Sequence, residues 1–367
     1  MGSGELKHIC NAFDINWIST IGPHINELEK QLADYTSANH AVVLSSGTAA
    51  IHLALQMLGV SSGDSVLCQS FTFAGSAFPV TYQGAKPIFI DSETDTWNMD
   101  PDVLEDSILK LKAQSSKLKA IIPVHLYGMP YRINEIHDIA LQYGIPVIED
   151  AAEALGSKYH DQPCGSFGDF GVLSFNGNKI ITTSGGGALL SDNKEYIGRA
   201  KFLATQARDD SPHYEHSQIG YNYRMGNINA AIGLGQMEVL DERVQRKREI
   251  FKIYKSELAS FEDIKFPEEP EGHFSNRWLT TIVTKSFEQR EYIRFALEKE
   301  NIEARPLWKP MHLQPVFKDA DYFGGNVADG LFNRGLCLPS GTAITEQDLG
   351  RIIEIIRKVF NRRGRKG

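Results

Sequence analysis

Short apolar runs alternate with helical patterns along the first two thirds of the chain. The runs are rich in Val, Ile and Leu and lie at 41–46, 65–70, 87–91, 120–125, 146–150 and 171–175. Between most of them, apolar residues recur at helical spacing, as at 27–37 and 48–58. Strands that are apolar throughout belong to sheets covered by helices on both faces. The pattern therefore predicts an α/β domain with a doubly wound, mostly parallel sheet.

A long helical pattern from Asn229 to Leu258 leads out of this region. Its second half is dense in Arg, Lys and Glu at exposed spacing, as in a helix that bridges two units. Beyond it we expect a strand, a helix, a strand and a final amphipathic helix, at 277–284, 288–300, 303–308 and 348–360. We predict a large domain over residues 1–238 and a smaller C-terminal α+β domain over residues 239–367.

The composition limits the class of protein. The 367 residues are 42% hydrophobic and 23% charged, and the net charge of −8 argues against binding to nucleic acid or to an acidic membrane surface. No apolar stretch reaches transmembrane length, so no membrane insertion is expected. The four cysteines form no C-x-x-C pair, which predicts neither a metal site nor a redox pair. These features indicate a cytoplasmic protein.

Two local motifs suggest ligand chemistry, and each has a structural alternative. Gly47 and Thr48 lie between a strand and a helix, where free N–H groups and the helix dipole form an anion cradle. Taken alone, Thr48 fits a plain helix cap better. Asp150 ends an apolar run, where α/β proteins place functional groups. Asp150 and Glu153 also have the spacing of a capping box, and the two interpretations are even.

Lys179 is the third motif. It lies in "SFNGNKIITTSGGG" (174–187), directly after an apolar run and otherwise among small, polar or β-branched residues. A lysine held rigidly at a sheet edge and partly desolvated can form a Schiff base. Ser174 could donate to a phosphate, and the glycines at 185–187 suit close packing. In isolation, a solvated loop lysine is the simpler interpretation.

The three motifs together favour pyridoxal 5′-phosphate as the cofactor. In this order on an α/β chain, the cradle would hold the phosphate and Asp150 would keep the pyridine nitrogen protonated. Lys179 would form the Schiff base and then move the α-proton of the substrate. A hydride-transferring Rossmann enzyme is excluded, because no G-x-G-x-x-G follows the first strand.

Eight segments along nearly the whole chain resemble the nucleotide-sugar aminotransferases of the DegT/DnrJ/EryC1/StrS family. They include "NWISTIGPHINELEK", "SSGTAAIHLAL", "VIEDAAEALGS", "GVLSFNGNKIITTSGGG", "GYNYRMGNINAAIG" and "RPLWKPMH". The resemblance implies aspartate-aminotransferase fold type I. It also implies that Phe73 stacks on the pyridoxal ring and that Gly47, Thr48 and Ser174 hold the phosphate. Asp150 then meets the ring nitrogen, and Lys179 is the Schiff-base lysine.

Three further residues take roles from the resemblance. Asn222 and Arg224 resemble residues that reach the cofactor and substrate of the neighbouring subunit, which implies a homodimer with shared active sites. A surface salt bridge is the alternative for Arg224. Many relatives carry Gln at the position of Glu153, beside the O3′ oxygen of the cofactor. An ionised Glu cannot donate there, so Glu153 would have to be protonated or turned elsewhere.

The resemblance also implies a reaction. The dehydratases of the family have His in place of the Schiff-base lysine, so Lys179 implies aminotransfer. L-Glutamate is the implied donor, and C4 of a UDP-linked 4-keto-6-deoxy-N-acetylhexosamine the implied acceptor, giving a UDP-4-amino-4,6-dideoxy sugar for bacterial glycan synthesis. The alternatives are a GDP-4-keto-6-deoxymannose 4-aminotransferase of the perosamine synthase type, and a non-catalytic regulator on the same fold. Loss of Lys179 or Asp150 would have supported the regulator, and both are present.

The segment "RPLWKPMHLQPVF" offers contacts for the sugar nucleotide. Trp308, Lys309 and His312 would supply stacking, charge and hydrogen bonds. A structural turn bounded by prolines is an equally good interpretation of these residues.

Overall fold

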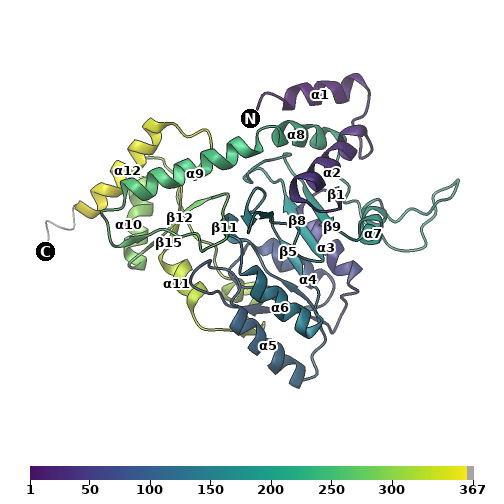
Figure 1. Cartoon of the computed structure of the whole chain (residues 1–367), viewed down its shortest axis with the longest axis horizontal. Coiled ribbons are helices and arrows are strands. Elements are labelled where there is room, and N and C mark those ends of the chain that lie inside the picture. The colour runs from purple at the N-terminus through teal and green to yellow at the C-terminus, as the bar shows by residue number, and fades with distance from the viewer. Residues whose placement is uncertain (362–367) are drawn as a thin grey trace.

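Eight strands form one sheet at the centre of the molecule (Figure 1). This computed structural model describes residues 1–361, and residues 362–367 of the predicted C-terminal domain lie outside the description. The strands are β1 (His40–Leu44), β2 (Ser65–Gln69), β3 (Lys86–Ile90), β4 (Leu118–Ile122), β5 (Ile148–Asp150), β8 (Phe170–Ser174), β9 (Gly187–Ser191) and β14 (Tyr322–Phe323). Parallel bridges between β4 and β5 join two four-stranded ladders into the order β1-β9-β8-β5-β4-β2-β3-β14. Only β9 runs antiparallel within this sheet, so the predicted mostly parallel sheet is confirmed.

Strand residues alternate between two apolar cores, which is why the strands read as continuous apolar runs. On one face, Val42 and Leu44 pack with helices α3 (Gly47–Met57), α4 (Phe78–Tyr82) and α7 (Lys194–Ala204). On the other face, Val43 packs with α2 (Pro23–Thr36) and α8 (Asn227–Met237). Further along the same face, Leu67 packs with α5 (Pro101–Ala113) and α6 (Ile133–Tyr143). Helix α1 (Glu5–Asp14) lies on α8 at the edge of the molecule.

The helical pattern predicted over 229–258 forms two helices instead of one. Helix α8 ends at Met237 and α9 (Leu240–Glu257) begins after Val239, whose φ of −117° and ψ of 9° interrupt the helix. The apolar periodicity continues across this irregularity, so the sequence does not reveal it. Helix α9 then leads to a second sheet, as Figure 1 shows.

The second sheet is antiparallel and built from later residues. Its order is β10 (Ile264–Lys265), β12 (Thr280–Thr284), β15 (Gly335–Leu338) and β13 (Arg305–Pro306). It shares an apolar core with α9, α10 (Phe287–Glu298) and α12 (Glu346–Asn361). Helix α11 (Val327–Arg334) contacts the same sheet. A small ladder pairs β6 (Lys158–Tyr159) with β7 (Gln162–Pro163) and with the later strand β11 (His273–Phe274).

Strand β14 leaves the C-terminal part of the chain and joins the large sheet. It pairs in parallel with β3, and the Phe89 and Asp91 N–H groups donate to Asp321 and Phe323 at 2.9 Å. The edge of the central sheet is therefore covered by residues from late in the chain. No helix within residues 1–361 is long and apolar enough to cross a membrane.

Candidate active site

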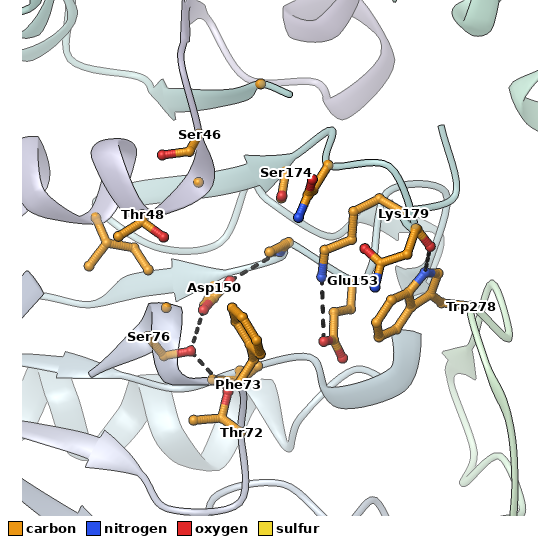
Figure 2. A pocket seen from close by; sticks show the side chains of 18 of the residues that line it. Ser46, Thr48, Thr72, Phe73, Ser76, Asp150, Glu153, Ser174, Lys179 and Trp278 are labelled. Atoms are coloured by element: carbon orange, nitrogen blue, oxygen red, sulfur yellow. Dashed lines mark hydrogen bonds and ion pairs between the residues drawn. The ribbon is translucent and has the colours of Figure 1, made fainter. Parts of the chain in front are cut away.

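A cavity of about 230 Å³ lies at the carboxyl ends of the parallel strands (Figure 2). Its walls come from the β1–α3 turn, the segment after β2, the ends of β5 and β8, and the turn that carries Lys179. Trp278 and Trp308, from the C-terminal part of the chain, close it on one side. Ligands of open α/β sheets bind at this edge because the strand ends and helix N-termini meet there.

The β1–α3 turn has the geometry of an anion cradle. Ser46 is the N-cap, and its Oγ accepts from the Ala49 N–H at 3.0 Å. The cap that the local pattern assigned to Thr48 is therefore wrong, and Thr48 lies inside the first turn with its side chain in the cavity wall. A Cβ on Gly47 would lie 3.3 Å from both the Leu173 carbonyl oxygen and the Ser174 Cβ, so a glycine keeps this approach open.

Gly187 explains part of the glycine run. A Cβ there would lie 2.4 Å from the Gly47 nitrogen, so β9 can pass behind the cradle only without a side chain at this position. Gly187 thus serves close packing, as the sequence suggested, whereas a Cβ on Gly185 would meet nothing within 4 Å.

Asp150 does not cap a helix. Residues 151–156 form turns, so the capping box proposed for Asp150 and Glu153 is absent. The Asp150 carboxylate is 4% exposed. Its Oδ1 accepts from the Ala152 N–H at 3.1 Å, and its Oδ2 accepts from the Ser76 hydroxyl at 2.6 Å. The side chain is thereby fixed at the end of β5, in the cavity wall.

A chain of hydroxyls holds Asp150 from behind (Figure 2). Ser76 and Thr72 have oxygens 2.9 Å apart. Because Ser76 gives its proton to Asp150, Thr72 is the donor to Ser76. Both hydroxyls are buried, at 2% and 1% exposure. The sequence could not identify this support, since serine and threonine after a strand usually read as turn residues.

Lys179 and Glu153 face each other across the cavity, as Figure 2 shows. The Lys179 Nζ lies 3.5 Å from the Glu153 Oε1. The Lys179 side chain is 10% exposed, so it is held in the cavity and is not a solvated loop lysine. The Trp278 ring also lies close to this amine, with its centroid 4.2 Å from Nζ.

Glu153 is a buried carboxyl in an unusual position. Desolvation raises its pKa above the ordinary range, against the opposing effects of Lys179 and of the Tyr127 N–H. Its Oε2 accepts from that N–H at 2.7 Å, which leaves Oε1 toward the cavity. Oε1 also lies 3.5 Å from the Lys179 Nζ. Glu153 therefore lines the cavity beside Lys179, and the state in which it would meet the cofactor stays a prediction.

Two aromatic groups have free surfaces in the cavity. The Phe73 ring is 52% exposed although its neighbours Phe71 and Thr72 are buried, and it lies 5.5 Å from the Trp308 ring, centroid to centroid. The Trp308 Nε1 is buried and has no hydrogen-bond partner within the described chain. An exposed ring face and an unpaired donor are what a stacking, hydrogen-bonding ligand would satisfy.

Four predicted site residues lie outside the cavity. Lys309 is exposed on the outer surface, and Asn222 is exposed and accepts from the Gln206 side chain at 3.1 Å. His312 has both ring nitrogens engaged, by Ser70 at 2.7 Å and by Asp329 at 3.1 Å. The expected substrate contact of His312 is therefore corrected: its imidazole secures the segment after Trp308 to the end of β2.

Arg224 also differs from the expectation. It is 7% exposed, pairs with Glu29 and donates to the Val43 carbonyl at 3.0 Å, all within its own chain. Burial beside a carboxylate holds the guanidinium in place. A salt bridge is therefore present, although a buried one, and the role of Arg224 in a neighbouring subunit's site stays a prediction.

A buried group of His125, Glu149 and Cys164 has potential metal-ligand atoms within 4.8 Å of one another. Glu149 accepts from the His125 Nε2 at 2.7 Å and from three backbone N–H groups at 165, 167 and 168. The His125 Nδ1 accepts from the Tyr131 N–H at 3.2 Å. Because both ring nitrogens are used, this cluster is a hydrogen-bonded support below β5.

The residues present fit pyridoxal phosphate. The cradle at Gly47 suits a phosphate, the Phe73 face suits a planar ring, and Asp150 suits a protonated ring nitrogen. Lys179 points its amine into the same cavity. The Trp308 indole N–H, which has no partner among the described residues, adds an unused donor in the wall of this cavity.

Comparison with known proteins agrees with this chemistry. The DegT/DnrJ/EryC1/StrS aminotransferase family matches residues 1–357. The EpsN protein of Bacillus subtilis (strain 168), an aminotransferase by name, is 49% identical over 98% of this chain and 94% of its own. A GDP-perosamine synthase of Escherichia coli O157:H7 is 38% identical over 97% of this chain and 96% of its own.

A solved structure shows the same fold with the cofactor. Spr1654 of Streptococcus pneumoniae, named as a sugar aminotransferase, superposes in its PLP form with a TM-score of 0.90, at 29% identity over 99% of this chain and 97% of that one. It is also known in a PMP form. The predicted fold type I is thus confirmed. The chain belongs to the DegT/DnrJ/EryC1/StrS family and is a pyridoxal phosphate-dependent sugar aminotransferase.

Proposed function

We propose that this enzyme transfers the amino group of L-glutamate to C4 of a UDP-linked 4-keto-6-deoxy-N-acetylhexosamine. The product would be a UDP-4-amino-4,6-dideoxy sugar for bacterial glycan synthesis. The observation that carries the aminotransfer is the Lys179 amine in the same buried cavity as Asp150. The sugar rests on the resemblance of 174–187 and 305–317 to enzymes that aminate such UDP-sugars.

The roles of the chain's own residues follow from the site. Bound there, pyridoxal phosphate would supply an electron sink for the charge left when a proton leaves the amino acid. Lys179 is the residue for its covalent attachment and, once free, the base that takes this proton and returns it. Asp150 supplies the negative charge that stabilises a protonated ring nitrogen. Gly47, Thr48 and Ser174 bind the phosphate.

The remaining residues orient the ligands. Phe73 would offer its ring face to the cofactor, and Glu153, if protonated, would donate from Oε1 to an oxygen on the ring. The unpaired Trp308 Nε1 would donate to an oxygen of the sugar substrate. Lys309 lies on the outer surface beyond Trp308, where the charged diphosphate of a nucleotide sugar would extend.

A GDP-linked substrate is the second candidate. The GDP-perosamine synthase of Escherichia coli matches this chain almost end to end at 38% identity. The same cavity would accept a GDP-4-keto-6-deoxymannose, because the sugar ring binds within it and the base binds outside.

We also propose a homodimer with shared active sites, working in the cytoplasm. The end of α1 and the segment after it expose large apolar side chains, with Phe13 61%, Trp17 45%, Ile18 53% and Ile21 66% exposed. A patch of this kind is typical of a surface that a second subunit covers. Asn222 is exposed and outside its own cavity, so it is available to the site of a partner. The cysteines at 10, 68, 164 and 337 are all free, as in a reducing compartment.

A substrate panel tests the proposal. The purified enzyme would be incubated with L-glutamate and with UDP-, GDP- and dTDP-linked 4-keto-6-deoxy sugars, and the products measured by mass spectrometry. Amination of the UDP-linked N-acetylhexosamine at the highest kcat/KM is expected. Preference for the GDP sugar would transfer the assignment to the second candidate. Amination of none of them would refute both.

A further inference from the structure

Trp278 reaches the catalytic lysine from a distant part of the chain. It lies just before β12, in the segment that leads into the second sheet, and is 1% exposed. Its ring centroid lies 4.2 Å from the Lys179 Nζ, and Figure 2 shows the indole beside Lys179 and Glu153. An ammonium over the face of an indole is attracted by the negative potential of the ring.

The indole is fixed by hydrogen bonds around its residue. Its Nε1 donates to the Asn178 carbonyl at 2.8 Å, which joins it to the residue just before Lys179. Its backbone N–H donates to the Asn276 side chain at 2.8 Å, and its carbonyl accepts from the Lys247 Nζ at 2.8 Å. The Tyr127 ring stacks beside it at 6.4 Å between centroids. A side chain held only for packing would not need the direction of its ring fixed this way.

The charges near Lys179 are few. Glu153 lies 3.5 Å from its Nζ, and Asp150 lines the same cavity. Lys247 donates to the Trp278 carbonyl at 2.8 Å, and desolvation lowers its pKa to about 8. The face of Trp278 thus adds to Glu153 a second group that stabilises an ammonium at Lys179.

We propose that Trp278 is a positioning residue that stabilises the ammonium form of Lys179 once the free amine has taken a proton. This rests on the role of Lys179 under the proposed function. A proton taken from the substrate converts the free amine to an ammonium, and its delivery restores the amine. Trp278 gains and loses no bond. It keeps the charged nitrogen out of water and close to the substrate, to which the proton is returned.

Cofactor-free protein provides the test. Lys179 would be labelled with trinitrobenzenesulfonate, which reacts with neutral amines, and quantified by peptide mass spectrometry from pH 7 to pH 11. Replacing the ring by Trp278→Leu removes the stabilisation of the ammonium, so labelling at pH 8 should be about 2- to 30-fold faster than in the wild type. The ratio of the two rates should fall as the pH rises to 11, because the ring no longer distinguishes the variants once the proton has left the amine. Trp278→Phe keeps a weaker ring and should give a smaller change.

Two controls separate charge from access. Trp308→Leu opens the same cavity without touching Lys179, so any increase in labelling should be the same at every pH. Trp278→Met, also without a ring, replaces the leucine variant if that variant does not fold. Equal labelling of all variants at pH 8 would overturn the proposal, as would an increase in Trp278→Leu that persists unchanged at pH 11. No sugar or turnover is needed, so the result is independent of the substrate assignment. Borohydride fixation of the cofactor tests the role of Lys179 separately.

Discussion

Replacing Asp150 by Asn tests the electrostatic basis of the site. The substitution keeps the shape of the side chain and removes its charge. The amide oxygen can still accept from the Ala152 N–H, and the amide nitrogen can donate to the Ser76 oxygen. The Ser76 hydroxyl can then rotate to donate to Thr72, 2.9 Å away. We therefore expect the fold and its melting temperature to change little.

The size of the effect follows from burial. Two unit charges about 4 Å apart interact by about 1 kcal/mol in water and by about 4 kcal/mol at an effective dielectric constant near 20. Asp150 is only 4% exposed, so the second figure applies. If that interaction is realised mainly in the transition state, its loss slows the reaction roughly 10³-fold, against roughly 5-fold for a solvated site.

The assay is the half-reaction with glutamate, followed by the loss of visible cofactor absorbance after rapid mixing. Ser76→Ala is the matched control, since it removes one hydrogen bond in the same network but keeps the charge, and we expect less than a tenfold change. A half-reaction of Asp150→Asn within tenfold of the wild type, with cofactor bound, would refute the electrostatic role of Asp150.

Three further predictions follow from the same structure. Lys179→Ala should bind the cofactor without covalent attachment and show no multiple turnover. Borohydride treatment followed by mass spectrometry measures the attachment. A cofactor adduct fixed to another residue would contradict the assignment of Lys179. If Asn222 serves the partner's site, mixing Lys179→Ala with an inactive Asn222→Ala should restore up to half of the wild-type activity per heterodimer. The reason is that one site of the heterodimer then carries both defects and the other site carries none. Verified heterodimers without activity would place Asn222 in the site of its own chain. The pKa of Lys247 is lowered from 10.5 to about 8 in the folded state. Between pH 8 and pH 10.5 the folded protein has therefore released a proton that the unfolded protein keeps, so the free energy of unfolding rises with pH. Relative to Lys247→Met, the wild type should gain about 3 kcal/mol of unfolding free energy between pH 7.5 and pH 10.5, and parallel curves in urea denaturation would contradict this.

The large sheet was predictable because burial on both faces leaves a strong pattern. Strand β9 was not predicted, since its residues follow three glycines that read as a turn. The glycine requirement becomes clear only in three dimensions, where Gly187 passes against the start of α3. The break between α8 and α9 was not predicted, because one irregular residue does not change the spacing of the apolar residues.

The centre of the site was also predictable, because each of its groups follows the end of a strand. The residues that hold these groups in place were not predictable. Ser76 lies 74 residues from Asp150, and Trp278 comes from a different sheet. The segment 308–312 shows the limit of residue type as a guide. Trp308 faces the cavity, whereas His312 turns back toward Ser70. Likewise, an arginine such as Arg224 gives no sign in the sequence of whether it extends outward or pairs with a carboxylate 195 residues away.

The pairing of β14 with β3 bears on how this protein is made. Ribosomal synthesis delivers β3 more than two hundred residues before β14, so the backbone groups on that edge of β3 stay unpaired for most of translation. An open edge is a template for pairing with other chains. The Asp91 carboxylate, which accepts from the backbone N–H groups of 325, 327 and 328, also waits for these late residues. A nascent chain that ends before residue 323 thus exposes the unpaired edge of β3 to other chains. Completion of the polypeptide covers this edge and so protects the N-terminal half from aggregation.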